Sequence, residues 1–420
     1  MRFVFLLCTI AAVMARPAIA QPDIEEQRKA FRAAYNKAEL GIWSLNPEQE
    51  RQLSNYVLWP DLRATYMRAT LRHRSDDELR AFLDEHGTLK PARELRYRYA
   101  LHLARNDRLA DYLEIYRQFY QGLEIAKLDC LALQGELNEG KQKRVINLGR
   151  ELWLVGKSQV EECDPVFSQL RNDGALGTDL YRERFDLAIA SRNFSLARYL
   201  AKSIGNDYLS EADLWHSANA DRNGFISRHD DYGDSGSHRA RVLYVIERVA
   251  MRDPQTAVEM WHRVDSEYPF TGSQRDHVER HLALWAARRH HPDAAVLLAA
   301  LRDEAVDTEV LRWRARTALR VGDWNTVADS IGAMGDDQEA EEWQYWLSLA
   351  LRRLGNESAG AMALQSLANE RSFYGFLAAD ELGIEYAFDH KPLQPDPQIL
   401  AALESRNSIM RARELFLVGL

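Results

Sequence analysis

The sequence predicts an all-α protein, built as an α-solenoid in which helical hairpins stack side by side. Leu, Ala and Arg dominate the composition, β-branched residues are sparse, and runs that alternate like strands are hard to find. These features favour helices. Helix-length segments also recur with a drifting period of 31 to 38 residues. Hydrophobic residues make up 46% of the 420-residue chain, which is enough for a core and excludes a disordered protein.

The clearest repeats lie between residues 253 and 368. Their short breaks hold Gly, Asn, Asp and Pro, which end one helix and cap the next. Apolar residues between the breaks follow steps of three and four, which places each set on one helix face. A hairpin cannot bury such a face alone, so neighbouring hairpins must stack in a tetratricopeptide-like array. The breaks are Asp253-Pro254, His291-Pro292, Gly322-Asp323 and Gly355-Asn356, and the apolar sets are Val278, Leu282, Trp285; Trp324, Val327, Ile331, Met334; and Trp343, Leu347, Ala350, Leu354.

The first twenty residues have the features of a secretory signal peptide. Arg2 precedes an apolar run over residues 3–13, and Ala18-Ile19-Ala20 has the small-x-small form of a cleavage site. We therefore expect cleavage between Ala20 and Gln21 and an exported, soluble product. The apolar run is too short to span a bilayer, and no later stretch approaches the necessary length.

Charge and cysteine content limit the partners and predict one disulfide. Removing Arg2 and Arg16 with the signal changes the formal charge from −9 to −11, so nucleic acid is not an expected partner. Cleavage also removes Cys8 and leaves Cys130 and Cys163, an even pair that predicts a structural disulfide in an exported protein. No His lies between these two cysteines, so we expect no metal site there.

The chain before the repeats also consists of paired helices. We expect helices over residues 23–40, 77–86, 92–105 and 108–120. In the first of them Phe31, Ala34, Tyr35 and Ala38 share one face. Pro60 interrupts an apolar run at residues 56–62.

A Gly-Lys-Ser tripeptide at residues 156–158 resembles the end of a phosphate-binding loop. The full motif requires another Gly where this chain has Glu151, and no strand precedes it. The pattern therefore favours a helix that ends at Gly156.

Residues 219–230 partly match the offsets of a calcium-binding EF-hand loop. The first position is Asn and the last is Asp rather than the bidentate Glu that such a site prefers. We therefore predict that residues 219–238 form a solvated loop between helices rather than a calcium site. The matching positions are Asn219, Asp221, Asn223, Gly224, Ile226 and Asp230.

Other conspicuous residues favour structural roles, and we expect no catalytic, cofactor-binding or metal-binding residue in this sequence. Glu357-Ser358 and Glu404-Ser405 superficially resemble a catalytic Glu-Ser pair, but Glu357 follows a Gly-Asn break, where the first turn of a helix favours an acid. His290-His291 precedes Pro292 and predicts a solvated turn. Four tryptophans of the array have helical spacing, which favours core positions over a glycan-stacking platform: Trp285, Trp313, Trp324 and Trp343.

Four stretches along the chain resemble one known family. Tyr-Val-Leu-Trp-Pro-Asp-Leu at residues 56–62, and Leu-Trp-Leu-Val-Gly-Lys-Ser-Gln at residues 152–159 before Cys163-Asp164, are similar to the N-terminal region of soluble lytic murein transglycosylases. Trp-Gln-Tyr-Trp at residues 343–346 resembles the last solenoid hairpin of that family. Arg-Ser-Phe-Tyr-Gly-Phe-Leu-Ala-Ala at residues 371–379 resembles its junction with a linker domain. The spacing of the two remaining cysteines also fits the family's disulfide.

This resemblance implies a periplasmic protein of peptidoglycan turnover. It assigns residues 1–20 to the signal peptide, 21–370 to a U-shaped superhelical domain and 371–420 to the start of the linker domain. In the family, these domains form a ring with a lysozyme-like domain, which cleaves the β-1,4 bond between N-acetylmuramic acid and N-acetylglucosamine and leaves 1,6-anhydromuramic ends. A single Glu acts there as acid and then base. The expected partners are peptidoglycan glycan strands and other cell-wall enzymes, with no cofactor, for a monomeric protein.

The sequence ends at Leu420, before the expected position of the family's catalytic domain. The last helix would then leave an apolar face, made of Leu415, Phe416 and Val418, without a neighbour. Two functions remain open on the sequence alone. One is the non-catalytic part of a lytic transglycosylase, and the other is a stand-alone periplasmic scaffold that binds murein or a partner protein without catalysis.

Overall fold

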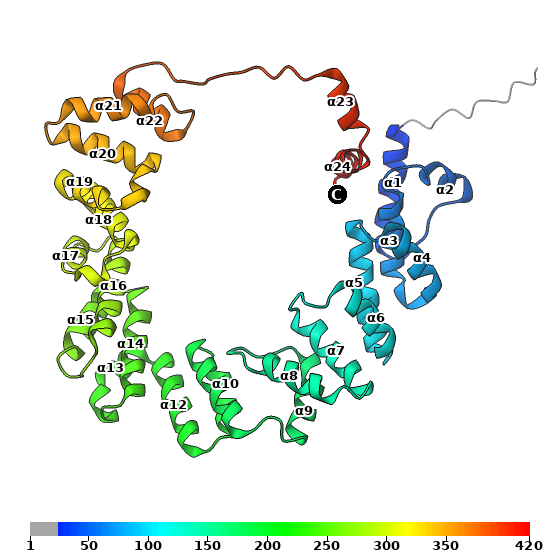
Figure 1. The fold of residues 1–420 in the computed structure, drawn as a ribbon, viewed down its shortest axis with the longest axis horizontal. Helices are drawn as coiled ribbons and strands as arrows, with labels where there is room; N and C mark the ends of the chain where they lie inside the picture. Colours follow the sequence, from blue (N-terminus) through cyan, green and yellow to red (C-terminus); the bar gives the residue numbers. More distant parts are fainter. Residues whose placement is uncertain (1–23) are drawn as a thin grey trace, which may run out of the picture. The chain divides into compact units, whose positions relative to one another are not determined.

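The structure is a computed structural model that describes residues 24–420, and all regular elements in this range are helices (Figure 1). The all-α prediction is therefore confirmed. The predicted signal peptide, with its cleavage site at Ala20 and Gln21, lies outside the described residues. No helix within residues 24–420 is long and apolar enough to cross a membrane. The described chain forms two compact units, and each is treated by itself below.

Unit 1 contains residues 24–153, 159–175 and 393–420. The helices predicted at residues 23–40, 77–86, 92–105 and 108–120 correspond to α1, α4, α5 and α6. Pro60 lies in the first turn of α3 and does not interrupt a helix. Backbone N–H groups in that turn have no partner within the helix, so the N–H that proline lacks costs no hydrogen bond. The elements are α1 (Ile24–Glu39), α2 (Pro47–Leu53), α3 (Trp59–Ala69), η1 (Leu71–His73), α4 (Asp76–His86), α5 (Lys90–Arg105), α6 (Leu109–Phe119), α7 (Ala126–Asn138), α8 (Gln142–Trp153), η2 (Glu161–Cys163), α9 (Asp164–Asn172), α23 (Pro397–Glu404) and α24 (Asn407–Val418).

Helix α5 lies at the centre of the N-terminal part of unit 1, where it packs against α3, α4 and α6. Leu95, Tyr99 and Leu103 recur every four residues and are fully buried, so they define the core face of this helix. The Tyr99 hydroxyl donates to the Asp76 carboxylate at 2.8 Å, which links the core of α5 to the start of α4. The opposite face of α5 is left exposed.

A disulfide joins Cys130 on α7 to Cys163 in η2. Both cysteines are fully buried. The Tyr112 hydroxyl on α6 donates to the Leu128 carbonyl beside this bond at 2.7 Å. The disulfide therefore ties residues 159–175 to the hairpin formed by α6 and α7.

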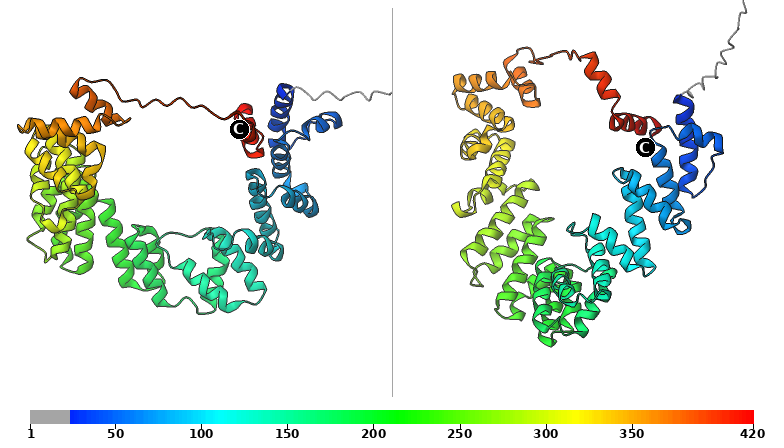
Figure 2. Two further views of the ribbon diagram at one scale, coloured as in Figure 1. Left: turned by 45° about the horizontal axis from the view of Figure 1, so that its top comes forward. Right: turned by 45° about the vertical axis from the view of Figure 1, so that its right-hand side comes forward.

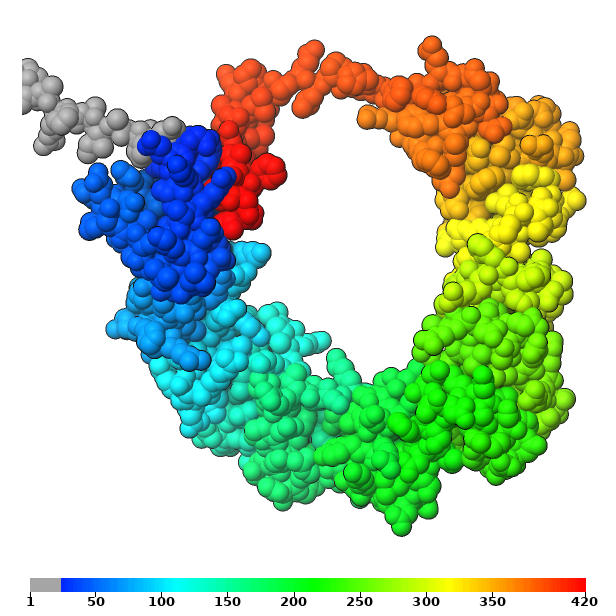
Figure 3. All heavy atoms as spheres, turned by 180° about the vertical axis from the view of Figure 1, so that it is seen from behind, coloured from blue at the N-terminus to red at the C-terminus, as the bar shows by residue number. Residues whose placement is uncertain are grey.

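The last helix of the chain packs against the first. Helix α24 lies beside α1 in the ribbon views (Figures 1 and 2), and the two segments touch in the space-filling view (Figure 3). Val418 is buried in the same cluster as Phe31, and Leu415 packs against it. The expectation of an unpartnered face was therefore wrong for these two residues. Phe416 is 83% exposed because it points away from the face that Leu415 and Val418 share.

Buried polar contacts fix α24 in place. The Glu414 carboxylate accepts hydrogen bonds from Arg28 at 2.8 and 2.6 Å and from the Tyr56 hydroxyl at 2.7 Å. The hydrogen bond from Arg28 is the main reason that the pKa of Glu414 lies below its usual value. On α3, Asp61 accepts from the guanidinium of Arg411 at 3.0 and 2.8 Å. Residues separated by about 350 positions or more are thus joined through paired charges.

Unit 2 contains residues 154–158 and 176–392. Its helices follow one another as hairpins, and each hairpin packs on the next. The elements are α10 (Thr178–Ala190), α11 (Phe194–Ala201), α12 (Asn206–Ala220), α13 (Arg222–Ser227), η3 (His229–Tyr232), α14 (Gly236–Ala250), α15 (Pro254–Val264), α16 (Gly272–Arg288), α17 (Ala294–Ala299), η4 (Asp303–Ala305), α18 (Thr308–Val321), α19 (Trp324–Gly332), η5 (Gly335–Glu339), α20 (Glu341–Arg353), α21 (Glu357–Leu367) and α22 (Phe373–Leu382).

All four predicted breaks of the repeat array fall between helices. Asp253 and Asp323 are N-caps whose carboxylates accept from the backbone N–H three residues later. Gly322 ends α18 in the left-handed conformation with φ of 75°, which a residue with a side chain rarely adopts. The predicted apolar positions are buried or partly buried except Leu354, which is 43% exposed because it follows the end of α20.

The predicted loop at residues 219–238 was wrong. Helix α12 continues to Ala220, and Asp221 then caps a further short helix, α13, by accepting from the Gly224 N–H at 2.9 Å. Phe225 and Ile226 are buried in the core of unit 2. These apolar residues hold the segment as helix because burying them offsets the low helix propensity of its Asn and Gly.

The helix that was predicted to end at Gly156 ends earlier, at Trp153. Gly156 instead allows the backbone to approach α10 closely, because a Cβ atom there would lie 2.3 Å from the Leu187 carbonyl oxygen. Arg184 donates to the carbonyls of Val155 and Lys157 at 3.3 and 3.2 Å. Gly156 is therefore a packing residue, and the described chain has no strand in front of it that could form a phosphate-binding loop.

Candidate functional site: a basic groove on α5

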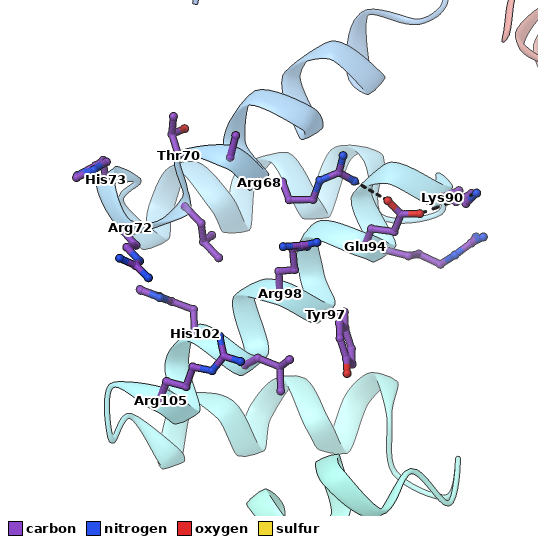
Figure 4. A pocket seen from close by; sticks show the side chains of 14 residues that line it. Arg68, Thr70, Arg72, His73, Lys90, Glu94, Tyr97, Arg98, His102 and Arg105 are labelled. Atoms are coloured by element: carbon purple, nitrogen blue, oxygen red, sulfur yellow. Dashed lines mark hydrogen bonds and ion pairs between the residues drawn. The ribbon is translucent and has the colours of Figure 1, made fainter. Parts of the chain in front are cut away.

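An open groove of about 770 Å³ lies between the end of α3, η1 and the exposed face of α5 (Figure 4). The spacing of α5 creates it, because the residues between the buried positions Leu95, Tyr99 and Leu103 must point outward. Most of these outward residues are basic. The polar and charged residues of the lining are Arg68, Thr70, Arg72, His73, Lys90, Arg93, Glu94, Tyr97, Arg98, His102 and Arg105.

The charge of the groove is opposite to that of the whole chain. Six Lys and Arg side chains line it with a single carboxylate, whereas the chain carries a formal charge of −9. That carboxylate, Glu94, lies 2.6 Å from Arg68 and 3.9 Å from Lys90. Arg93 donates to the Thr88 carbonyl at 2.7 Å. The one acid of the lining is therefore already paired.

Four arginines of the lining have no carboxylate partner within the described chain, and one of them, Arg93, is engaged by the Thr88 carbonyl. Arg72, Arg98 and Arg105 take part in no ion pair among residues 24–420, and Arg72 and Arg98 are directed with His102 toward the space between η1 and α5 (Figure 4). A guanidinium presents a planar fork of donors that matches a carboxylate or a phosphate. Tyr97, 36% exposed on the same helix face, adds an aromatic surface for a sugar ring or an apolar group. The arrangement is suited to binding an anionic ligand.

Sequence reasoning missed this groove, although part of its signal is visible in the sequence. Arg93, Arg98 and Arg105 fall between the apolar positions of a predicted helix. Arg72 belongs to a separate segment, however, and it reaches the same space only because η1 folds beside α5. A list of basic residues along the chain does not show which of them converge.

The residues singled out from the sequence do not converge on any site. Glu357 begins α21 and accepts from Arg352 at 2.7 Å, so it has a structural partner. Glu404 is the exposed last residue of α23. His290 is exposed and His291 partly buried in a turn, where the His291 ring lies 2.7 Å from the side chain of Gln255.

The EF-hand pattern does not form a calcium loop. Asn219, its first position, lies within α12, and its side-chain oxygen accepts from Arg222 and from the Tyr244 hydroxyl, both at 2.7 Å. Asp221 is engaged as the N-cap of α13. A calcium loop needs these oxygen atoms to converge on one point, whereas here they serve the ends of two helices.

The tryptophans of the array pack between repeats. Trp343 is buried, and Trp285, Trp313 and Trp324 are partly buried beside core clusters. The Arg288 guanidinium lies 5.1 Å from the ring centre of Trp285 and 5.9 Å from that of Trp313. Arg316 bridges Trp313 and Trp343 in the same way, at 5.6 and 5.0 Å. Cation–π contacts thus connect successive hairpins.

Fold and groove together define a helical-repeat protein with a basic groove. No established family profile matches the chain, but comparison with individual proteins is informative. The chain is 25% identical over 421 residues to the soluble lytic murein transglycosylase of Escherichia coli strain K12, a match that covers 98% of this chain and 63% of that protein. The corresponding enzyme of Salmonella typhimurium strain LT2 is also 25% identical, over 94% of this chain and 61% of its own length.

Solved structures agree with these sequence matches. An inactive mutant of the lytic transglycosylase Slt from Pseudomonas aeruginosa aligns with a TM-score of 0.69 and 30% identity, over 92% of this chain and 63% of that one. The 70-kDa soluble lytic transglycosylase Slt70 of Escherichia coli aligns with a TM-score of 0.73 and 24% identity, over 94% and 63%. The chain belongs to the soluble lytic murein transglycosylase family, and it spans about 63% of the length of the relatives that it matches.

Proposed function

We propose that the chain is the superhelical, non-catalytic part of a peptidoglycan-turnover protein and that it acts in the periplasm as a monomer. The observation that carries this proposal is the match to soluble lytic murein transglycosylases over 98% of the chain. The whole protein would then cleave glycan strands without hydrolysis, at the bond between N-acetylmuramic acid and N-acetylglucosamine. Residues 21–370 would form the superhelical domain, and residues 371–420 the start of the linker domain.

Within this proposed function, the basic groove would bind the peptidoglycan strand. Peptidoglycan is anionic through the carboxylates of its peptide stems, whereas the amino-sugar backbone carries little charge. Arg72, Arg98 and Arg105 offer three guanidinium groups with no internal ion pair to bind such carboxylates, and Tyr97 lies on the same face. We infer that the groove holds the peptide-bearing strand while chemistry takes place elsewhere in the protein.

Pelleting with purified peptidoglycan sacculi tests both parts of the proposal. The wild-type chain should sediment with sacculi, and the bound fraction should fall as NaCl rises from about 50 to 300 mM, because exposed ion pairs are screened by salt. The triple variant R72E/R98E/R105E should bind at least about tenfold more weakly, since each exposed pair contributes roughly 0.2–1 kcal/mol and charge reversal adds repulsion.

A matched control carries the same change in charge. Arg252, Arg263 and Arg320 are exposed in unit 2 and form no ion pair among residues 24–420, and the triple variant R252E/R263E/R320E should bind like the wild type. Sacculi whose carboxylates are blocked by amidation should lose the salt-dependent part of binding. Absence of wild-type binding at low salt would refute the peptidoglycan role, and equal binding by the two triple variants would refute the role of the groove alone.

A further inference from the structure

A buried histidine and two carboxylates come together in unit 2, away from the groove. His229 lies in η3, Asp230 follows it, and Glu267 lies after α15. The Nε2 atom of His229 is 3.0 Å from Asp230 Oδ1 and 3.4 Å from Glu267 Oε2. One ligand atom from each of the three residues lies within 4.8 Å of the other two. The His229 side chain is 4% exposed, whereas those of Asp230 and Glu267 are 81% and 46% exposed.

A second layer of side chains fixes the direction of the His229 ring. The Tyr268 hydroxyl lies 2.9 Å from His229 Nδ1 and 3.0 Å from His238 Nε2. Tyr268 packs in the core of unit 2 against Phe270, so its own position is fixed. With Nδ1 held by the hydroxyl, Nε2 faces the two carboxylates. A polar partner on the second ring nitrogen is the usual way in which proteins orient a metal-binding histidine.

The separations suit a small divalent ion. A tetrahedral ion with bonds of about 2.0 Å requires ligand atoms about 3.3 Å apart. The two separations from His229 Nε2, 3.0 and 3.4 Å, bracket this value. Calcium needs longer bonds and a larger set of oxygen ligands, so an imidazole nitrogen in this position favours a zinc-like ion.

The charge around the cluster also suits a cation. Asp230 and Glu267 form no ion pair with Lys or Arg within the described chain. Asp234 pairs with Arg239, so the nearest guanidinium is already engaged.

We propose that His229, Asp230 and Glu267 bind one divalent transition-metal ion of the zinc type, with solvent completing the coordination. The site connects η3 to the segment after α15, so the ion adds to the hydrogen bonds by which Tyr268 already joins these two segments. It is independent of the peptidoglycan function and would be present whether or not the groove binds murein.

Titration calorimetry of the full chain, stripped of metal by chelator and dialysis, tests the site with ZnCl2. We expect one site per chain with micromolar affinity or better and a rise of several degrees in Tm. The variants D230N and E267Q should each weaken zinc binding at least tenfold. Both side chains are exposed, so neither substitution should prevent folding. Y268F leaves all three ligands in place but removes the hydroxyl that orients His229, so it should weaken binding about tenfold.

Two control variants separate this site from adventitious binding. D231N removes the neighbouring exposed acid, and H290Q removes an exposed histidine far along the chain; both should bind zinc like the wild type. Co²⁺ should show the visible absorption of a low-coordinate site in the wild type and lose it in E267Q. Wild-type zinc binding by D230N and E267Q, the absence of stoichiometric binding, or equal affinity for Ca²⁺ would each overturn the proposal.

Discussion

Replacing Arg411 with Met should weaken the attachment of α24 to α3 by about 3–5 kcal/mol. Arg411 donates to both carboxylate oxygens of Asp61, at 3.0 and 2.8 Å, and to the Val57 carbonyl at 2.7 Å. Asp61 is only 6% exposed. Met retains most of the apolar stem of the side chain but removes its charge, which leaves a buried carboxylate without a counter-ion. Removing one partner of a buried ion pair costs about this amount.

This loss of stability should be smaller in acid. Burial is the largest influence on Asp61 and raises the pKa of its carboxyl, although Arg411 opposes the rise. A group whose pKa is raised on folding stabilises the fold fully below its unfolded pKa, and this contribution is lost as the pH rises through the folded pKa. Without the guanidinium the pKa rises further. The difference between R411M and the wild type should therefore be smaller at about pH 5 than at about pH 7.5.

Urea unfolding followed by circular dichroism, together with hydrogen exchange of residues 407–418, measures the effect. The matched control is R413M, the same substitution at an exposed position of the same helix that forms no ion pair among residues 24–420, and it should stay within about 0.5 kcal/mol of the wild type. The double variant D61N/R411M should recover part of the loss, because no buried charge remains. Equal effects of R411M and R413M, or a double variant no more stable than R411M, would refute the reasoning.

Three further predictions concern other parts of the molecule. The variant C163A should lose about 3–4 kcal/mol of stability in urea unfolding, the effect expected for a closed loop of 33 residues, and added reductant should then change nothing further. G156A should lose about 1–3 kcal/mol of stability, because its Cβ would overlap the Leu187 carbonyl. The control G332A has open space around its Cβ and should be neutral or slightly stabilising. Equal melting temperatures for the two variants would contradict this account. Removing the carboxylates of peptide stems by amidation should abolish the salt dependence of sacculus binding, and unchanged salt dependence would assign it to another charge.

Local signals in the sequence were sufficient for four helices of unit 1, α1, α4, α5 and α6, and for the repeat breaks of unit 2. Caps such as Asp253 and Asp323 and the left-handed Gly322 act within a few residues, so their chemistry is visible without the fold. Segment 219–238 could not be predicted in this way. It has the composition of a loop, and its residues 222–227 are helical because Phe225 and Ile226 are buried in a core formed with distant helices.

The candidate sites depend even more on tertiary contacts. The basic groove needs Arg72 from η1 beside α5, and the proposed metal site needs Glu267 beside His229, 38 positions earlier. No local sequence motif describes the spacing between Arg72 and α5 or the spacing between His229 and Glu267. The Glu-Ser and Gly-Lys-Ser motifs, by contrast, were visible at once in the sequence; in the structure Glu357 pairs with Arg352, and Gly156 packs against α10.

The contact between α1 and α24 sets an order in which the chain can finish folding. Arg28 emerges at the very start of synthesis, but its buried partner Glu414 is 386 residues further along. Until that helix arrives, the guanidinium of Arg28 lacks its buried partner and the surface that Val418 covers stays exposed, although Phe31 already packs against Tyr56. Contacts of such long sequence separation form late because a large loop must close first. Helix α1 is thus among the last helices to be completed, although it lies near the start of the described chain.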